Sequence, residues 1–177
     1  FALGETSVRI TATDAAGNAA SCTFTVTVRD TTAPTLTCPA DTFAEATDMT
    51  GAEVTYAAVT PQDAVSGSSV TVATTAASGS RFAPGTTSVR ITATDAAGNA
   101  AACTFTITVR DTTAPTLTCP VDIVAEATDA TGAEVTYAVV APQDAVSGSS
   151  VTVAASASSG SRFALGETSV RITATDA

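Results

Sequence analysis

The sequence predicts an all-β protein built from tandem antiparallel β-sandwiches. Three observations predict this fold class. The apolar residues are mainly Ala and Val, with six Phe, two Tyr, one Met and no Trp, and together with abundant Thr this mixture favours strands over helices. The sequence also repeats itself at a fixed interval. Within each copy, apolar and polar residues alternate in the way that is typical of a half-buried strand.

The internal repeat has a period of 81 residues, so that Phe1, Phe82 and Phe163 align. A comparison of residues 1–81 with residues 82–162 leaves about 13 differences, most of them mild. Near-identical copies of one domain therefore follow each other along the chain.

The predicted boundaries lie at the motif DTTAP, which begins at Asp30 and again at Asp111. Its Pro fixes φ and keeps the preceding residue extended, so the motif is expected to be a short, semi-rigid linker. The chain should then hold the end of one repeat (1–30), a complete repeat (31–111) and the start of another (112–177). We expect a segment of a longer array. The alternative is a fragment whose 1–30 hairpin completes the unfinished repeat of another chain.

Within the complete repeat, strands are expected at residues 36–38, 53–59, 69–74, 89–93 and 104–109. The last two show the clearest alternation, with Val, Ile, Ala or Phe at every second position and Thr or Arg between them. Asp95 to Asn99 should connect them as a tight turn, which completes a hairpin. Several short strands in roughly 80 residues predict an immunoglobulin-like sandwich.

The run TLTCP, followed by PQDAVSG and then by SGSRFAPGTTSVRITATDAAGNAAACTFTITV, closely resembles the hyalin repeat (HYR) domain. That family has a Cys-Pro near its start, a Ser-Gly-Ser segment before an F-x-x-G-x-T strand, and DxxGN followed by Cys and an alternating strand. The resemblance covers the complete repeat and both flanking pieces. It implies an immunoglobulin-like fold and extracellular adhesion or interaction roles, without implying catalysis or a particular ligand.

Four cysteines could pair in three ways. Cys38 begins the first strand of the complete repeat and Cys103 begins the last, and both strands should start at the same end of the sandwich. We therefore predict a Cys38–Cys103 disulfide. Pairing Cys22 with Cys38 would span roughly 50 Å of extended chain, which is far more than a disulfide tolerates. Cys22 and Cys119 are expected to pair with cysteines outside this sequence.

Disulfides form in oxidising compartments, so the protein is expected to be extracellular or at the cell surface. No stretch approaches the ~20 apolar residues needed to cross a bilayer, and no membrane insertion is expected within this sequence. Seventeen acidic residues against seven Arg, with no Lys, give a net charge of −10. Because a phosphate backbone would be repelled, no nucleic-acid partner is expected.

The absence of His and Lys leaves the many Ser and Thr without the usual activating bases, so the sequence predicts that the protein is not an enzyme and has no catalytic residues. A zinc site is equally disfavoured, because there is no His and no CxxC motif.

Acidic residues should instead converge at the linkers. The strand directions place two loops of each repeat beside the linker that precedes it. At the first junction the converging residues would be Asp30, Asp63, Asp95 and Asn99, and at the second Asp111, Asp144 and Asp176. Carboxylates and loop carbonyls are calcium ligands, so calcium is the one cofactor that we consider. The alternative is that these Asp residues only cap turns.

Two functions fit these observations. The first is a structural subunit of an extracellular stalk or self-assembling surface filament, in which the partner is another copy of the protein or a neighbouring repeat. Near-identical repeats favour it, because an interface that forms once can form along the whole array. The second is a multivalent cell-adhesion module, in which the repeats bind a protein or glycan receptor on a cell surface with avidity.

Overall fold

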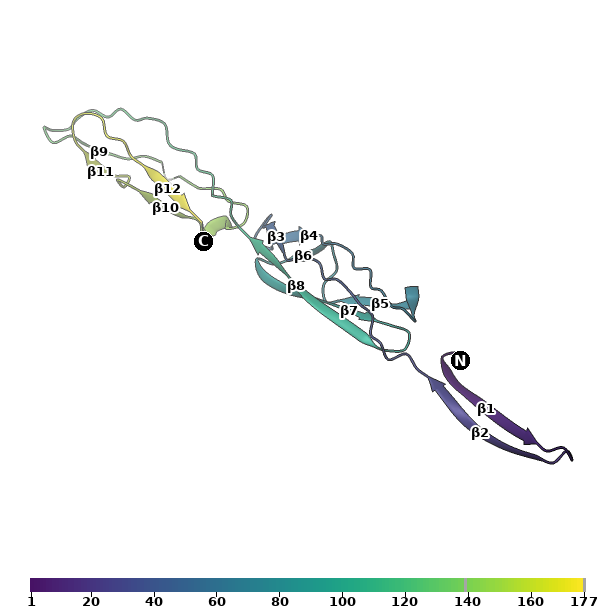
Figure 1. Cartoon of the computed structure of the whole chain (residues 1–177). Helices are drawn as coiled ribbons and strands as arrows, with labels where there is room; N and C mark the ends of the chain where they lie inside the picture. The colour runs from purple at the N-terminus through teal and green to yellow at the C-terminus, as the bar shows by residue number, and fades with distance from the viewer. Residues whose placement is uncertain (139, 177) are drawn as a thin grey trace. The chain divides into compact units, whose positions relative to one another are not determined.

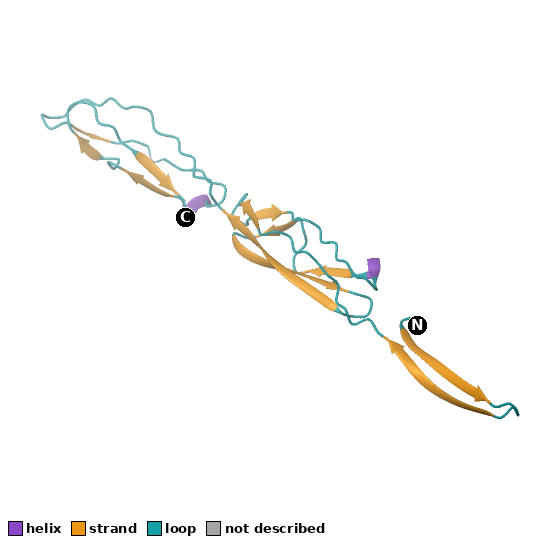
Figure 2. Cartoon of the chain, in the orientation of Figure 1, coloured by secondary structure: helices purple, strands orange, loops and turns teal. Residues whose placement is uncertain are grey.

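The computed structural model describes residues 1–138 and 140–176. The protein is all-β, which confirms the predicted fold class, and its strands are joined by turns and loops (Figures 1 and 2). The helical content of the described residues is two short 3-10 helices, η1 (Gly67–Ser69) and η2 (Gly148–Ser150). Contacts group the chain into two compact units, one made of Phe1–Ala40, Ala57–Ala77 and Val89–Phe105, the other of Asp41–Tyr56, Ser78–Ser88 and Thr106–Ala177.

The chain begins with a β-hairpin formed by β1 (Gly4–Thr13) and β2 (Ala19–Val28), which pair antiparallel along their whole length (Figure 1). Asp14 organises the turn between them. Its Oδ1 atom accepts hydrogen bonds from the backbone N–H groups of Ala16 and Asn18 at 3.0 and 2.8 Å. The turn therefore has the Asx geometry that Asp favours.

The central repeat contains six strands: β3 (Thr42–Glu45), β4 (Ala52–Val54), β5 (Thr71–Thr74), β6 (Ser80–Phe82), β7 (Gly85–Thr94) and β8 (Ala100–Arg110). Four of them form a sheet in the order β3-β8-β7-β5, and β4 pairs with β6 in a second sheet. The pair β3–β8 is parallel, whereas β4–β6 and β5–β7 pair antiparallel.

The core of the central repeat comes from alternate residues of its two long strands, as the sequence pattern predicts. In β7 and β8 the inward positions are at most 3% exposed, and they are Val89, Ile91, Ala93, Phe105, Ile107 and Val109. The small β4–β6 sheet also buries Ala52, Val54 and Phe82. The side chains between these positions are largely Thr and Arg, and they point toward solvent or are half-buried.

Three strand predictions differ from the structure. The strand expected at residues 69–74 begins at Thr71, because Ser69 belongs to η1. The strand expected at residues 53–59 ends at Val54, and the hydroxyl of Ser78 replaces the ladder beyond it by donating to the carbonyl of Tyr56 and accepting from its N–H, at 2.9 and 2.8 Å. No strand forms at residues 36–38, and the residue before them, Thr35, makes an isolated bridge with Gln62. The first strand of the repeat is β3, which begins four residues beyond Cys38.

The last repeat reproduces part of this arrangement with β9 (Ala133–Val135), β10 (Thr152–Ala155), β11 (Ser161–Phe163) and β12 (Ile172–Thr175). β9 pairs with β11 as β4 does with β6, and β10 pairs with β12 as β5 does with β7. Equivalent sequences therefore adopt equivalent local pairings.

Candidate metal centres at the linkers

Three carboxylates come together at the first linker. Asp30 follows β2, Asp63 lies in the loop before η1, and Asp95 follows β7, yet one carboxylate oxygen of each lies within 4.8 Å of the others. Asp95 is only 6% exposed, while the other two are half-buried. The loops on which these residues lie are far apart in sequence, so the tertiary structure assembles the cluster.

Two of the three carboxylates are held by hydrogen bonds within their own loops. Asp63 Oδ1 accepts from the backbone N–H groups of Val65 and Ser66 at 2.9 and 2.6 Å. Asp95 accepts from the backbone N–H of Asn99 at Oδ1 and from its side-chain amide at Oδ2, both at 2.8 Å. Burial alone would raise the pKa of Asp95, but the hydrogen bonds from Asn99 and the following turn outweigh it and lower the pKa.

Asp30 differs from the other two in one respect. Its Oδ1 atom accepts a hydrogen bond from the backbone N–H of Thr32 at 3.1 Å, whereas its Oδ2 atom is buried and has no hydrogen-bond partner. Buried polar oxygens are normally paired, because an unpaired one loses its hydration without compensation. An electron-rich oxygen is thus left available beside two further carboxylates.

Asn99, also expected at this junction, contacts the cluster through its amide nitrogen. That nitrogen donates to the backbone carbonyl of Asp30 at 3.2 Å and to Asp95 Oδ2 at 2.8 Å. Through its amide nitrogen, Asn99 therefore connects the linker carbonyl of Asp30 to the carboxylate of Asp95.

The second linker carries an equivalent cluster of Asp111, Asp144 and Asp176, each displaced by one repeat from its counterpart, with one oxygen of each again within 4.8 Å of the others. Asp144 Oδ1 accepts from the backbone N–H groups of Val146 and Ser147, as Asp63 does from its own loop. Ser147 also donates from its hydroxyl to Asp111 Oδ2 at 3.3 Å. The sequence reasoning therefore named the residues that the structure brings together at both linkers.

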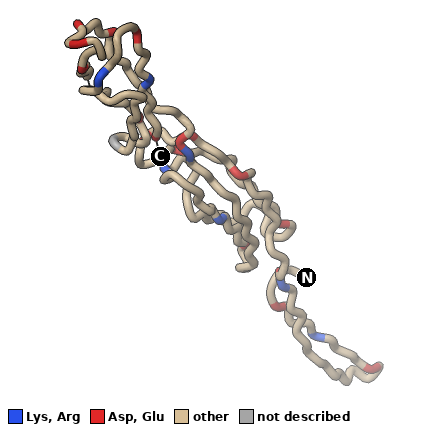
Figure 3. The backbone as a smooth tube through the Cα atoms, turned by 90° about the vertical axis from the view of Figure 1, so that its left-hand side faces the viewer, with Lys and Arg blue, Asp and Glu red and all other residues tan. Residues whose placement is uncertain are grey.

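The chemistry of both clusters suits a hard divalent cation. Acidic residues outnumber basic ones along the traced backbone (Figure 3), and each cluster presents three carboxylates and no nitrogen or sulfur ligand among the residues named. Ionised carboxylates at this separation repel one another, and a cation between them removes that repulsion. Calcium accepts carboxylate and carbonyl oxygens in flexible geometry, so each cluster offers donors of the kind that calcium takes.

Cys38 and Cys103 form a disulfide in the central repeat, with their Cα atoms 5.8 Å apart and 65 residues between them in sequence. Cys22 and Cys119 are exposed free thiols within this chain. Their pairing with cysteines outside the sequence remains a prediction.

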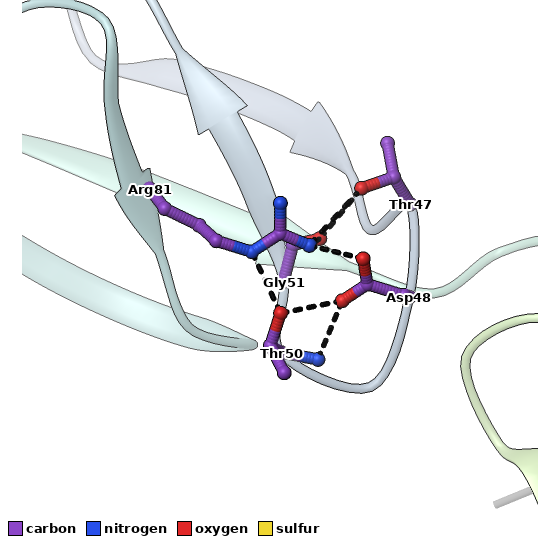
Figure 4. Close-up of polar contacts among 5 residues, drawn as sticks. All are labelled: Thr47, Asp48, Thr50, Gly51 and Arg81. Carbon is purple, nitrogen blue, oxygen red and sulfur yellow. Dashed lines mark hydrogen bonds and ion pairs between the residues drawn. The ribbon is translucent and has the colours of Figure 1, made fainter.

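Sequence reasoning missed a second polar site, around Arg81 (Figure 4). Its guanidinium pairs with Asp48 and donates to the Thr50 hydroxyl at 2.6 Å and the Gly51 carbonyl at 3.1 Å. Arg162 makes the corresponding contacts one repeat later, with Asp129, Thr131 and Gly132. The recurrence of the same Arg and Asp at the repeat interval is the sequence signal that could have revealed this site. These contacts stabilise the loop after β3. The site has no arrangement suited to catalysis or metal binding.

None of the helices in the described residues has the length and apolar composition that crossing a membrane requires.

The chain is similar to known proteins, and its family match follows the repeats. A family model described as the HYR domain matches residues 1–28, 29–109 and 110–177. Hyalin from Strongylocentrotus purpuratus is 42% identical over 110 residues, which make up 60% of this chain and 9% of hyalin, so the chain spans less than a tenth of that relative. Among solved structures, the protocadherin gammaB7 EC3-6 cis-dimer structure aligns with 98% of this chain and 56% of its own, at 20% identity and a TM-score of 0.39.

Proposed function

Because the chain belongs to the HYR domain family, a family of extracellular, adhesion-type domains, we propose that it is a structural segment of an extracellular stalk or self-assembling surface filament whose linkers bind calcium. The pair of equivalent acidic clusters carries this proposal. One cluster lies at each DTTAP linker, and each combines one linker Asp with two loop Asp residues from the repeat that follows.

A bound calcium ion would join the linker to the repeat that follows it. Asp30 lies in the linker itself, whereas Asp63 and Asp95 lie in loops of the central repeat. The ion would give the unpartnered Oδ2 of Asp30 a ligand role and neutralise three like charges. Any ion that binds the folded state and not the unfolded chain also stabilises the fold, by about 2.7 kcal/mol at 100 times its dissociation constant.

The near-identity of the repeats supports the structural role. Repeats with the same surface make the same contact with each neighbour, so one favourable contact is multiplied along the array. The proposed partner is therefore the protein itself, either as neighbouring repeats or as other copies.

The residues available also support a non-enzymatic, extracellular role. The chain has neither His nor Lys to activate a nucleophile, and its central repeat is closed by a Cys38–Cys103 disulfide, which persists in oxidising compartments. The second function in view is a multivalent adhesion module for a protein or glycan receptor. A ligand that saturates at one molecule per repeat would favour that function.

The calcium part of the proposal is tested by thermal unfolding of the chain in calcium and in excess EDTA. We expect a higher Tm in calcium, and a smaller calcium-induced shift in a Asp63→Asn, Asp144→Asn double variant. Asp122→Asn is the matched control, because Asp122 is exposed and belongs to neither cluster. An identical Tm with and without calcium would show that the Asp residues only cap turns.

The assembly part is tested by electron microscopy of native surface material at a resolution that separates single chains. An ordered multi-chain filament that repeats at the domain spacing is the expected result. Isolated, flexible strings of domains would contradict the filament and favour a stalk or an adhesion module.

A further inference from the structure

Glu45, a residue of the central repeat, binds the linker that follows this repeat. This residue is the last of β3 and pairs in register with Arg110, the last residue of β8. Its Oε1 atom accepts hydrogen bonds from the backbone N–H of Thr112 at 2.8 Å and from the Thr113 hydroxyl at 2.9 Å. Its Oε2 atom accepts from the Thr112 hydroxyl at 2.7 Å. One carboxylate therefore binds three donors on two consecutive linker residues.

The strand that carries Glu45 is itself attached to the end of β8. The backbone N–H of Ala46 donates to the carbonyl of Arg110 at 2.7 Å, and the Arg110 guanidinium lies 4.9 Å from the ring centroid of Phe43. These contacts extend the parallel β3–β8 pairing to the point where the linker begins. Glu45 then continues the attachment beyond the end of the sheet.

Asp111 lies between these two attachments. Arg110, before it, is paired with β3, and Thr112, after it, is bound by Glu45. The Asp111 carboxylate accepts from the Thr113 N–H at 3.2 Å and from the Ser147 hydroxyl at 3.3 Å. The first of these bonds recurs at the other linker, where Thr32 donates to Asp30 at 3.1 Å, so the turn within the linker is a property of the motif itself.

We propose that Glu45 is a positioning residue that fixes the linker at Thr112 and Thr113 and thereby sets the Asp111 carboxylate among Asp144 and Asp176. The calcium consequence of this inference rests on the proposed function, whereas the fixing of the linker does not. The hydrogen bonds from Thr112 and Thr113 lower the pKa of Glu45, with the Thr112 backbone N–H the largest cause, so its carboxylate is ionised at neutral pH.

The experiment uses the whole 177-residue chain with Glu45→Ala and Glu45→Gln. Glu126→Ala and Glu126→Gln are the matched controls, because Glu126 is the exposed residue at the same position of the next repeat. The first measurement is hydrogen exchange of the Thr112 amide in EDTA. We expect Glu45→Ala to accelerate it about ten-fold or more, because the amide loses a charged acceptor. Glu45→Gln should have a smaller effect, since its amide oxygen still accepts from Thr112.

The second measurement is a calorimetric calcium titration in an Asp63→Asn background, which removes the first cluster and leaves the second. Glu45→Ala should weaken calcium binding about ten-fold, as loss of a residue that orients a ligand does, and the Glu126 variants should bind as the parent does. Unchanged Thr112 exchange in a folded Glu45→Ala chain would overturn the proposal. If the parent binds no calcium while Glu45→Ala still accelerates Thr112 exchange, the calcium function fails and the role of Glu45 in fixing the linker stands.

Discussion

The side-chain amide of Asn99 donates a hydrogen bond to the backbone carbonyl of Asp30 at 3.2 Å, across 69 residues of sequence. The same nitrogen donates to Asp95 Oδ2. Asn99 thus connects the linker to the turn after β7 and orients a carboxylate of the first acidic cluster. Both hydrogen bonds come from its amide nitrogen, which acts only as a donor.

The first prediction concerns this residue. Asn99→Ala should weaken calcium binding at the first cluster by about ten-fold, because residues that orient metal ligands contribute at that level. Calorimetric titration in an Asp144→Asn background, which removes the second cluster, provides the measurement. Asn18→Ala is the control, since Asn18 makes the equivalent bond to Asp14 in the β1–β2 turn, outside both clusters. Equal calcium affinity in Asn99→Ala and the parent would contradict the role of Asn99.

The second prediction concerns the disulfide. Replacing Cys38 and Cys103 together by Ser should lower the free energy of unfolding by about 4 kcal/mol, because a cross-link across 65 residues restricts the unfolded chain. Urea unfolding of the central repeat gives the value. A Cys22→Ser, Cys119→Ser variant should unfold like the parent, since both thiols are exposed and unbonded in this chain. Comparable losses in the two variants would argue against a specific contribution of the Cys38–Cys103 bond.

The third prediction concerns Gly51, whose carbonyl also accepts from Arg81 (Figure 4). Its φ is +106°, and a Cβ atom there would lie 1.8 Å from the carbonyl oxygen of Phe82. Gly51→Ala should therefore cost about 4 kcal/mol or more, through backbone strain combined with a steric clash against the backbone. Gly98→Ala separates the two effects, because Gly98 has φ +91° but open space around it. It should lose only about 1–2 kcal/mol, and equal losses in urea unfolding would rule out the clash.

The fourth prediction concerns acid stability. Hydrogen bonds from Thr50, followed by the contact with Arg81, lower the pKa of Asp48 to about 2. Its pKa in the unfolded chain is about 3.9. The carboxylate therefore contributes stability that is fully present above about pH 4 and is lost as the pH falls toward 2.

Asp48→Asn should remove this part of the pH dependence. Urea unfolding between pH 5 and pH 2 measures it, and the variant should lose less stability over that window than the parent does. Asp122→Asn, which changes an exposed Asp, should keep the slope of the parent. Parallel curves for the parent and Asp48→Asn would mean that the Arg81 site makes no contribution in this pH range.

Long strands were predictable because their alternation of apolar and polar residues extends over many positions of the sequence. Alternate positions of β7 and β8 are buried, so each strand offers several apolar residues at period two, and Val89, Ile91 and Ile107 follow that rule. The short strand β3 offers only four residues, and it pairs with β8 some 65 residues later in the parallel direction. A segment of that length has too few positions to display a period, so the sequence pattern did not indicate it.

The acidic clusters were predictable for a different reason. Strand direction alone determines which loops share one end of a sandwich, and it predicts that Asp30, Asp63 and Asp95 lie at the same end. Strand direction contains no information about which atom of a side chain faces its neighbour. The amide nitrogen of Asn99, the unpartnered oxygen of Asp30 and the reach of Glu45 to Thr112 depend on distances of about 3 Å.

By itself, the amino-acid sequence determined the repeat, the all-β class and the residues that alternate into the core, because repetition and burial act on consecutive positions of the chain. Only the tertiary structure decided the parallel pairing of β3, the contacts of Arg81 with Asp48 and the attachment of the second linker to Glu45. Each of these joins residues more than 30 positions apart, where the partner is selected by the packing of whole strands and not by neighbouring residues.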